Sequence, residues 1–137
     1  MEKIEVSHSE MDAQFIRERI NEFNFKRVPH YNHQTLNLIV RRQNTIIAGL
    51  LGDTAWDWLY ISYFWVHEHE RSLGLGTRVL TAAEEMAMRR GCKRANLETH
   101  DFQSLGFYLK RGYIIFGQLE NFPEGHTKYY LWKDLAG

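Results

Sequence analysis

Two spacings of apolar residues recur along the chain and predict helices and strands. Apolar residues three or four positions apart predict an amphipathic helix over residues 10–23 and a second helix over residues 75–90. Ser9 can cap the first of these helices, and Gly91 can end the second in the left-handed conformation. A shorter apolar repeat predicts a third helix in "QSLGFYLKR", residues 103–111.

Runs rich in β-branched and aromatic residues predict the strands. Residues 35–41 and 45–51 form a predicted hairpin with Gln43 and Asn44 as its turn. Residues 58–66, "WLYISYFWV", are apolar at both odd and even positions, which favours a central strand covered on both faces. Four further strands are predicted in "KIEV", "RANLETH", "YIIFGQL" and "TKYYLWKDL". The order βαβββαβαββ predicts an α/β (α+β) fold, with a mixed, mostly antiparallel sheet and helices on both faces.

Length and charge narrow the class of protein. A chain of 137 residues is expected to form a single domain, residues 1–137. Its 17 basic and 17 acidic residues balance, so neither nucleic acid nor an anionic membrane is an expected partner. Cys92 is the only cysteine, which excludes an intramolecular disulfide, and the N-terminus lacks the apolar core of a signal peptide. Together these features predict a cytoplasmic protein.

The stretch "ERSLGLGT", residues 70–77, places two glycines between a predicted strand and a predicted helix. Backbone amides and about half a positive charge at a helix N-terminus attract anions. Gly74 and Gly76 have no Cβ to block the approach, and Arg71 adds a guanidinium. The stretch therefore predicts a phosphate or pyrophosphate site. It is neither a P-loop, because no Lys follows Gly76, nor a dinucleotide fingerprint, because Val79 stands where Gly or Ala is needed.

Two motifs carry a resemblance to a known family. Residues 71–76, "RSLGLG", resemble the motif Q/R-x-x-G-x-G/A of the GNAT superfamily of acyl-CoA-dependent N-acetyltransferases. Residues 107–113, "FYLKRGY", resemble its second signature, Y-x-K-x-G-F/Y. The resemblance covers nearly the whole chain and implies a sheet whose central strands splay apart to hold acetyl-CoA. It implies direct transfer of acetyl from acetyl-CoA to a primary amine, with a small molecule as the expected acceptor. The alternative is a non-catalytic CoA-binding sensor or interaction module on the same fold.

The resemblance also implies the cofactor site. Arg71 matches the first motif position, amides within residues 72–77 would hold the pyrophosphate, and the strand end at residues 64–66 would meet the pantetheine arm. Asp101 stands where the family often has Asn, so Gln103 or Ser104 is considered in its place. The implied cofactor-binding residues are Phe64, Trp65, Val66, Arg71, Ser72, Leu73, Gly74, Leu75, Gly76, Thr77, Gln103 and Tyr108.

Tyr108, at the tyrosine of the second motif, is implied as the general acid for the leaving thiolate. Glu98 lies on the strand where some members of the family place a base. Because alternation puts Glu98 and His100 on one side of that strand and Thr99 on the other, either of the two, or water, is left as the base. An amide at the strand end, that of Val66, is the candidate for stabilising the oxyanion.

Other histidines are weighed and assigned no chemistry. "HEHE", residues 67–70, lacks metalloprotease spacing and has no distant cysteine cluster, so no metal is expected. His30 and His33 lie in one of the two stretches, 24–34 and 119–127, that the family uses for the acceptor.

The exposed strand segment "KYYLW" leaves both a monomer and a homodimer open.

Overall fold

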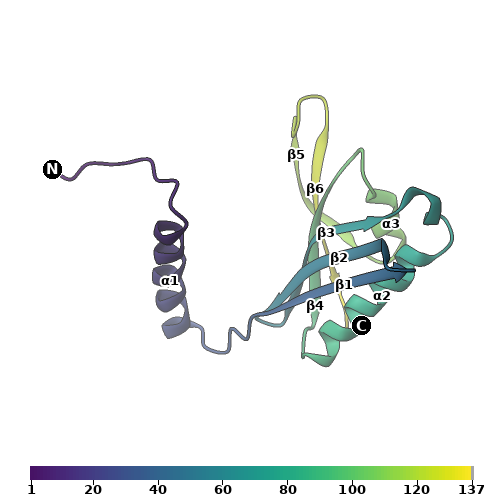
Figure 1. Ribbon diagram of the computed structural model, residues 1–137, viewed down its shortest axis with the longest axis horizontal. Coiled ribbons are helices and arrows are strands. Elements are labelled where there is room, and N and C mark those ends of the chain that lie inside the picture. Colours follow the sequence, from purple (N-terminus) through teal and green to yellow (C-terminus); the bar gives the residue numbers. More distant parts are fainter. Residues whose placement is uncertain (137) are drawn as a thin grey trace. The chain divides into compact units, whose positions relative to one another are not determined.

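The structure, a computed structural model, describes residues 1–136 (Figure 1). They fall into two compact units, Met1–Tyr31 and the part that begins at Asn32. The first unit contains helix α1, and the second contains the sheet and the remaining helices.

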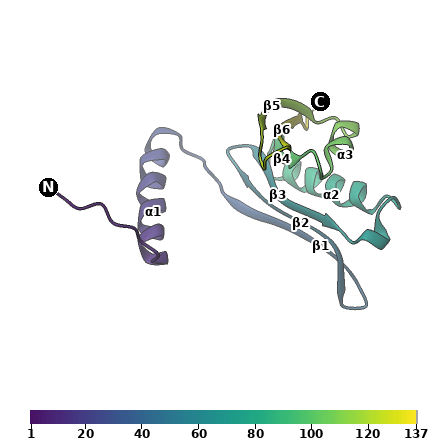
Figure 2. The same cartoon turned by 90° about the horizontal axis from the view of Figure 1, so that it is seen from above.

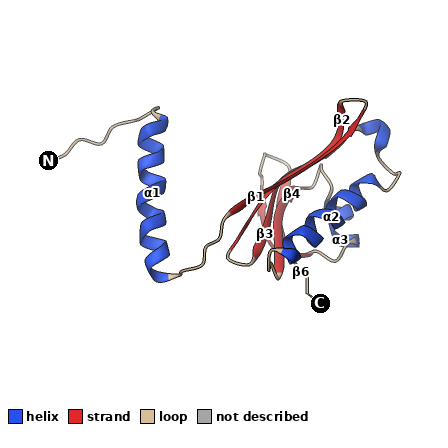
Figure 3. Cartoon of the chain, turned by 60° about the horizontal axis from the view of Figure 1, so that its bottom comes forward, coloured by secondary structure: helices blue, strands red, loops and turns tan. Residues whose placement is uncertain are grey.

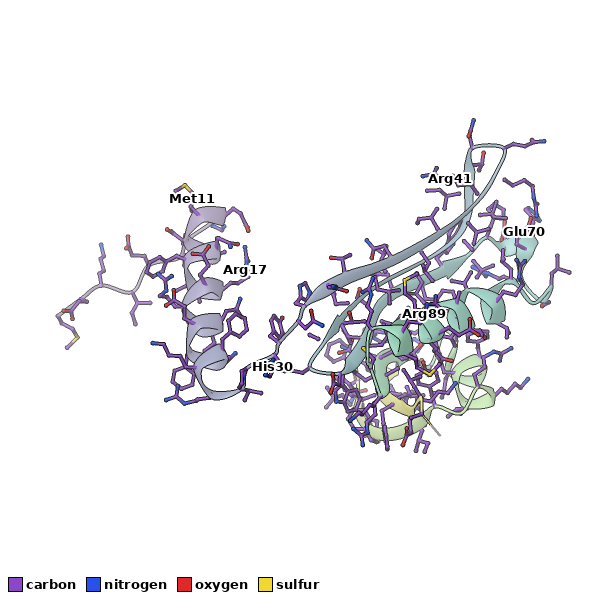
Figure 4. The ribbon with its side chains drawn as sticks, turned by 90° about the horizontal axis from the view of Figure 1, so that it is seen from below. Met11, Arg17, His30, Arg41, Glu70 and Arg89 are labelled. Carbon is purple, nitrogen blue, oxygen red and sulfur yellow. The ribbon has the colours of Figure 1, made fainter. Side chains whose placement is uncertain are left out.

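Helix α1, Glu10–Arg27, begins where the sequence predicts and runs four residues further. The Ser9 side chain accepts a hydrogen bond from the Asp12 amide, which confirms the predicted cap. None of the helix residues is buried, and Met11 and Arg17 project from its surface (Figure 4).

The predicted strand "KIEV" is wrong. Residues 1–9 contain no strand, and the two serines that follow "KIEV" are used by the helix instead. The hydroxyl of Ser7 donates to the Asp12 carboxylate, and the hydroxyl of Ser9 accepts from the Asp12 amide. Four residues of alternation without a neighbouring strand are not enough to form a ladder.

The second unit is built on a six-stranded sheet in the order β1-β2-β3-β4-β6-β5 (Figures 2 and 3). All neighbouring strands are antiparallel except the parallel pair β3 and β4, as the mixed sheet requires. Gln43 and Asn44 both have positive φ, 49° and 70°, which is the two-residue turn that hairpins favour. The strands are β1 Gln34–Arg42, β2 Thr45–Ala55, β3 Trp58–Val66, β4 Arg94–His100, β5 Ile114–Glu120 and β6 Thr127–Asp134.

Helices α2, Leu75–Arg89, and α3, Leu105–Lys110, share one face of this sheet. Leucine and alanine side chains of α2 pack on β1, β2 and β3, and this contact forms the core. The ring of Phe107 on α3 lies against Gly76 at the start of α2. The short helix η1, Glu68–Glu70, precedes α2. Helices on both faces of the sheet remain a prediction, because α1 belongs to the other unit.

The splayed central strands that the resemblance implies are present. Strands β3 and β4 pair from Trp58 and Arg94 to Ile61 and Leu97. Beyond these residues the strands separate, so the carboxyl ends of β3 and β4 leave an opening in the sheet.

Within the second unit, β3 is covered on one face only. Leu59 and Ile61 are buried beneath α2, whereas Tyr63 and Trp65 are 71% and 47% exposed. Coverage of the opposite face stays a prediction, because α1 belongs to the other unit. The aromatic run that predicts a strand covered on both faces therefore includes side chains, those of Tyr63 and Trp65, that border the opening.

A buried charged cluster ties α2 to the last two strands. Glu84 is 8% exposed, accepts a hydrogen bond from the Tyr113 hydroxyl at 2.7 Å, and lies 3.0 Å from Nζ of Lys133. Burial and the neighbouring Glu84 carboxylate raise the pKa of Tyr113 well above its ordinary value, so its hydroxyl stays a donor. The cluster satisfies a carboxylate that would otherwise be costly to bury.

We expect Lys133→Met to lower the free energy of unfolding by about 1–3 kcal/mol, because it leaves the buried Glu84 carboxylate without a cation. Urea denaturation at pH 7 measures this loss. Lys93→Met is the control, since Lys93 is exposed and its side chain has no ion pair among the described residues. Equal stability of the two variants would contradict a role for the cluster.

Candidate functional site

A hollow of about 870 Å3 opens beside the carboxyl end of β3. Three segments contribute to it: the end of β3, the turn before α2, and the stretch from Phe102 through α3. Residues predicted from separate parts of the sequence meet here. The predicted cofactor residues that line it are Phe64, Trp65, Val66, Arg71, Ser72, Gly74, Gly76, Thr77, Gln103 and Tyr108.

Two predicted cofactor residues do not line the hollow with their side chains. Leu73 is 72% exposed, and Leu75 is buried in the core at 8% exposure. In a tight turn successive side chains point in different directions, so a continuous run of six residues cannot all face one cavity. Only the backbone amides of Leu73 and Leu75 remain candidates for ligand contact.

The turn before α2 has the backbone geometry of an anion site. Gly74 is the N-cap with φ +85°, a conformation that glycine adopts without strain. No side chain caps the helix, and its first turn contains no acidic residue. The amides of the first turn, which have no intrahelical partner, are therefore free of a competing carboxylate.

Three cations border the hollow: Arg71, Lys110 and Arg111. Nε of Arg71 donates to the Val66 carbonyl at 2.9 Å, which joins the turn to the strand end. Arg111 donates to the Thr77 hydroxyl at 3.0 Å, and its guanidinium lies 3.9 Å from the centre of the Phe107 ring. Lys110 and Arg111 were missed as site residues, although both belong to the second motif.

The amide of Val66 points into the opening. The next residue, His67, donates its amide to the Ile47 carbonyl of β2 at 2.8 Å. Because successive residues of a strand direct their amides to opposite sides, the Val66 amide points away from β2 and toward the gap left by β4. This orientation suits the predicted oxyanion role, which stays a prediction.

Tyr108 lies at the bottom of the aromatic wall formed by α3 and β3. Its ring centre is 6.4 Å from that of Phe64 and 5.7 Å from that of Tyr113. Burial raises the pKa of Tyr108 to about 12, so the hydroxyl is protonated at neutral pH. That hydroxyl has no hydrogen-bond partner among residues 1–136, and it is free to donate to a ligand.

Glu98 and His100 lie on the face of β4 opposite α2, while Thr99 is buried on the α2 face, as alternation predicts. The Tyr60 hydroxyl donates to Oε2 of Glu98 at 2.7 Å. Burial and Glu98 raise the pKa of Tyr60 to about 12. Nδ1 of His100 lies 3.1 Å from Oε1 of Gln103. Neither Glu98 nor His100 lines the hollow, so the structure does not bring the candidate bases together with Tyr108 in one cavity.

Asp101 has partners within the protein rather than in the hollow. Its carboxylate accepts from the Thr127 amide at 2.8 Å and lies 2.8 Å from Nδ1 of His126. The Asp101 side chain is therefore bound to residues at the start of β6. Gln103 and Ser104 line the hollow in its place.

In the described part of the chain, no group of three or more His, Cys, Asp or Glu side chains is placed to hold a metal ion. The rings of His67 and His69 stack with centroids 5.1 Å apart, and His33 contacts Asp53 at 2.9 Å. No helix within residues 1–136 is long and apolar enough to cross a membrane.

The chain is similar in sequence and in structure to known acetyltransferases. The sequence profile described as "Acetyltransferase (GNAT) family" matches residues 4–113. A blasticidin-S acetyltransferase from Streptomyces morookaense is 37% identical over 91 residues, which cover 66% of this chain and 67% of that protein. A crystal structure described as an acetyltransferase from Agrobacterium tumefaciens is 29% identical, with a TM-score of 0.89 over 98% of this chain and 99% of that one. A streptothricin acetyltransferase from Bacillus anthracis, crystallised with acetyl coenzyme A, is 23% identical, with a TM-score of 0.65 over 73% of this chain and 62% of that one.

Proposed function

Because this chain belongs to the GNAT family of acetyltransferases, we propose that it transfers the acetyl group of acetyl-CoA directly to the primary amine of a small molecule. The observation that carries the proposal is the hollow itself. It joins the turn before α2, whose first-turn amides lack a capping side chain, to the protonated hydroxyl of Tyr108, beside the opening between β3 and β4. The non-catalytic sensor remains the alternative.

The cofactor is proposed to lie along the hollow from the α2 turn to the strand end. Its pyrophosphate would meet the first-turn amides of α2, with Arg71, Lys110 and Arg111 supplying positive charge. Its thioester would lie beside the Val66 amide, which can donate to the developing oxyanion. Arg71 already donates to the Val66 carbonyl, so the pantetheine arm would pair with other backbone groups than that carbonyl.

The acceptor is proposed to approach through the opening from the face opposite α2. That face presents the exposed rings of Tyr63 and Trp65 on β3, and Tyr60, whose hydroxyl donates to the Glu98 carboxylate. An aromatic surface with one carboxylate suits a small cationic amine. The relative that acetylates blasticidin S makes that antibiotic the first acceptor to test.

The proposed chemistry needs no covalent enzyme intermediate. Holding both substrates in the opening supplies proximity. The amine attacks the thioester carbon, the Val66 amide stabilises the oxyanion, and Tyr108 donates its hydrogen to the leaving thiolate. Glu98 holds the acceptor's ammonium group by charge and is, with His100 and water, a candidate for receiving its proton.

Three further expectations remain proposals. The family match over residues 4–113 spans both compact units, which supports a single acetyltransferase domain. The cytoplasmic location rests on the sequence. The choice between monomer and homodimer rests on the strand segment near the C-terminus.

Mass spectrometry of reaction mixtures tests the proposal. We expect the full chain with acetyl-CoA and blasticidin S, or another small amine from a screen, to give a mono-acetylated product and an equal amount of free CoA thiol. Reactions without protein give the background. Tight binding of acetyl-CoA without acetylation of any amine in the screen would favour the sensor instead.

A further inference from the structure

Asp101 and His126 form a second polar cluster at the carboxyl end of β4. Oδ1 of Asp101 lies 2.8 Å from Nδ1 of His126, and its Oδ2 accepts from the Thr127 amide at 2.8 Å. The amide of Asp101 donates to the Thr127 carbonyl at 3.0 Å. These contacts hold the carboxylate between the end of β4 and the start of β6.

The same contacts determine which nitrogen of His126 carries the proton. The Thr127 amide and the His126 ring lower the pKa of Asp101, so its carboxylate is ionised at neutral pH and can only accept. Nδ1 of His126 must therefore be the donor, and Nε2 carries the lone pair. Within residues 1–136, Nε2 has no hydrogen-bond partner, and the side chain is 46% exposed.

Phe102 connects this pair to the hollow. Its ring meets His126 edge-on with centroids 5.0 Å apart and stacks on His100 with centroids also 5.0 Å apart. Phe102 itself lines the hollow beside Gln103. His126, like His100, does not itself line the hollow and is separated from it by the Phe102 ring.

We propose that His126 accepts the proton of the acceptor's ammonium group, directly or through one water, and that Asp101 positions it. The inference rests on the proposed acetyl transfer and deepens it. An N–H bond of the ammonium breaks and its proton joins Nε2. The freed lone pair attacks the thioester carbon, a C–N bond forms, and the C–S bond breaks. The thiolate takes a proton from the Tyr108 hydroxyl. The nitrogen then releases its second proton, which water carries to the Tyr108 oxygen.

Three observations favour His126 over the candidates from the sequence. One oxygen of Glu98 already accepts from the Tyr60 hydroxyl. His100 faces the neutral amide oxygen of Gln103. Of these three candidates, His126 is the one whose ring contacts a carboxylate, which stabilises the imidazolium it becomes in the manner of an Asp–His pair.

The charged and titratable groups around His126 come from two strands. His100 ends β4, and Asp101 directly follows it. Lys128 belongs to β6, and its ammonium is drawn to the Phe122 ring, 4.5 Å from the ring centre. Asp101 alone contacts the His126 ring nitrogen, so it sets the tautomer.

Nitrogen NMR of the His126 imidazole in the full chain tests the tautomer without any acceptor. We expect neutral His126 to carry its proton on Nδ1, and Asp101→Asn to move that proton to Nε2, because the asparagine amide can donate. A wild-type ring protonated on Nε2 would have its lone pair on Nδ1, which faces Asp101 and not the acceptor. That result would overturn the assignment.

Steady-state kinetics with the acceptor found by mass spectrometry tests the role. We expect His126→Gln to lower kcat at least about ten-fold and to leave the Kd of acetyl-CoA unchanged. As pH varies, the rate of this variant should follow only the fraction of the acceptor that is present as unprotonated amine. Asp101→Asn gives a smaller loss in the same direction, and His8→Gln, an exposed residue of the first unit, changes nothing. If His126→Gln kept the kcat and pH profile of the wild type, and Glu98→Gln or His100→Gln lost kcat instead, the role of His126 would be overturned and the proposed function would stand. Absence of acetyl-CoA binding by the wild type would instead overturn the proposed function.

Discussion

Tyr108→Phe is expected to lower kcat at least about ten-fold while the Kd of acetyl-CoA stays within two-fold of wild type, the size of loss that removal of a general acid produces. The substitution removes one oxygen atom and keeps the ring. The ring packs against Phe64, Phe107 and Tyr113, with centroids 5.4–6.4 Å apart, so the wall of the hollow is retained. What is lost is the only hydroxyl that α3 directs at the proposed position of the leaving sulfur.

The pKa of Tyr108 defines what that hydroxyl can do. Burial raises it to about 12, which keeps the group protonated through the neutral range. A thiol in water has a pKa of about 8.5, below that of Tyr108. Full transfer of the tyrosine proton to a hydrated thiolate is therefore unfavourable. In the hollow the thiolate is desolvated as well, and desolvation raises its proton affinity. The hydroxyl therefore stabilises the leaving sulfur by a hydrogen bond that can proceed to proton transfer.

Tyr113→Phe is the matched control for Tyr108→Phe. Tyr113 is also buried, but its hydroxyl is bound to Glu84 at 2.7 Å, and neither residue lines the hollow. We expect that variant to lose stability and to retain kcat. Normal turnover by Tyr108→Phe, or an equal loss of kcat in both variants, would contradict the assignment of the acid.

Gly74→Val is expected to weaken acetyl-CoA binding at least about 100-fold, or about 2.7 kcal/mol. Gly74 has φ +85°, where a β-branched residue is strained. A side chain there would also enter the space that the pyrophosphate is proposed to fill, because Gly74 lines the hollow and, apart from its chain neighbours, a Cβ there meets nothing within 4 Å. Isothermal titration calorimetry with acetyl-CoA measures the change.

Gly91→Val separates the loss of the anion site from backbone strain. Gly91 has φ +91°, and a Cβ there likewise meets nothing within 4 Å, but it lies at the other end of α2. We expect it to lower stability by a similar amount and to bind acetyl-CoA normally. Unchanged affinity of Gly74→Val, or equal weakening in both variants, would contradict the proposed role of the turn.

Much of the fold could be predicted because local signals agree with the tertiary structure. The turn at Gln43 and Asn44, the left-handed Gly91 and the cap at Ser9 all lie where their chemistry requires them. The hollow could be predicted because its two motifs each occupy consecutive residues. Their convergence follows from the way β3 and β4 separate after Ile61.

The errors have a common physical origin in long-range contacts. The aromatic composition of β3 predicted burial on both faces, yet within the second unit one face is open, because composition does not distinguish a covered face from the rim of an opening. "KIEV" alternates correctly but has no partner strand. Asp101 and His126 are 25 residues apart in sequence, and only the pairing of β4 with β6 brings them together. No spacing rule could have found that pair.

Calorimetric titration of the wild-type full chain with acetyl-CoA, with NADH and ATP as controls, tests the central claim most directly. The account predicts saturable binding of acetyl-CoA at one site per chain and no binding of either control, although all three ligands carry phosphates. Absence of acetyl-CoA binding by protein that is shown to be folded, or equal binding of NADH and ATP, would contradict it.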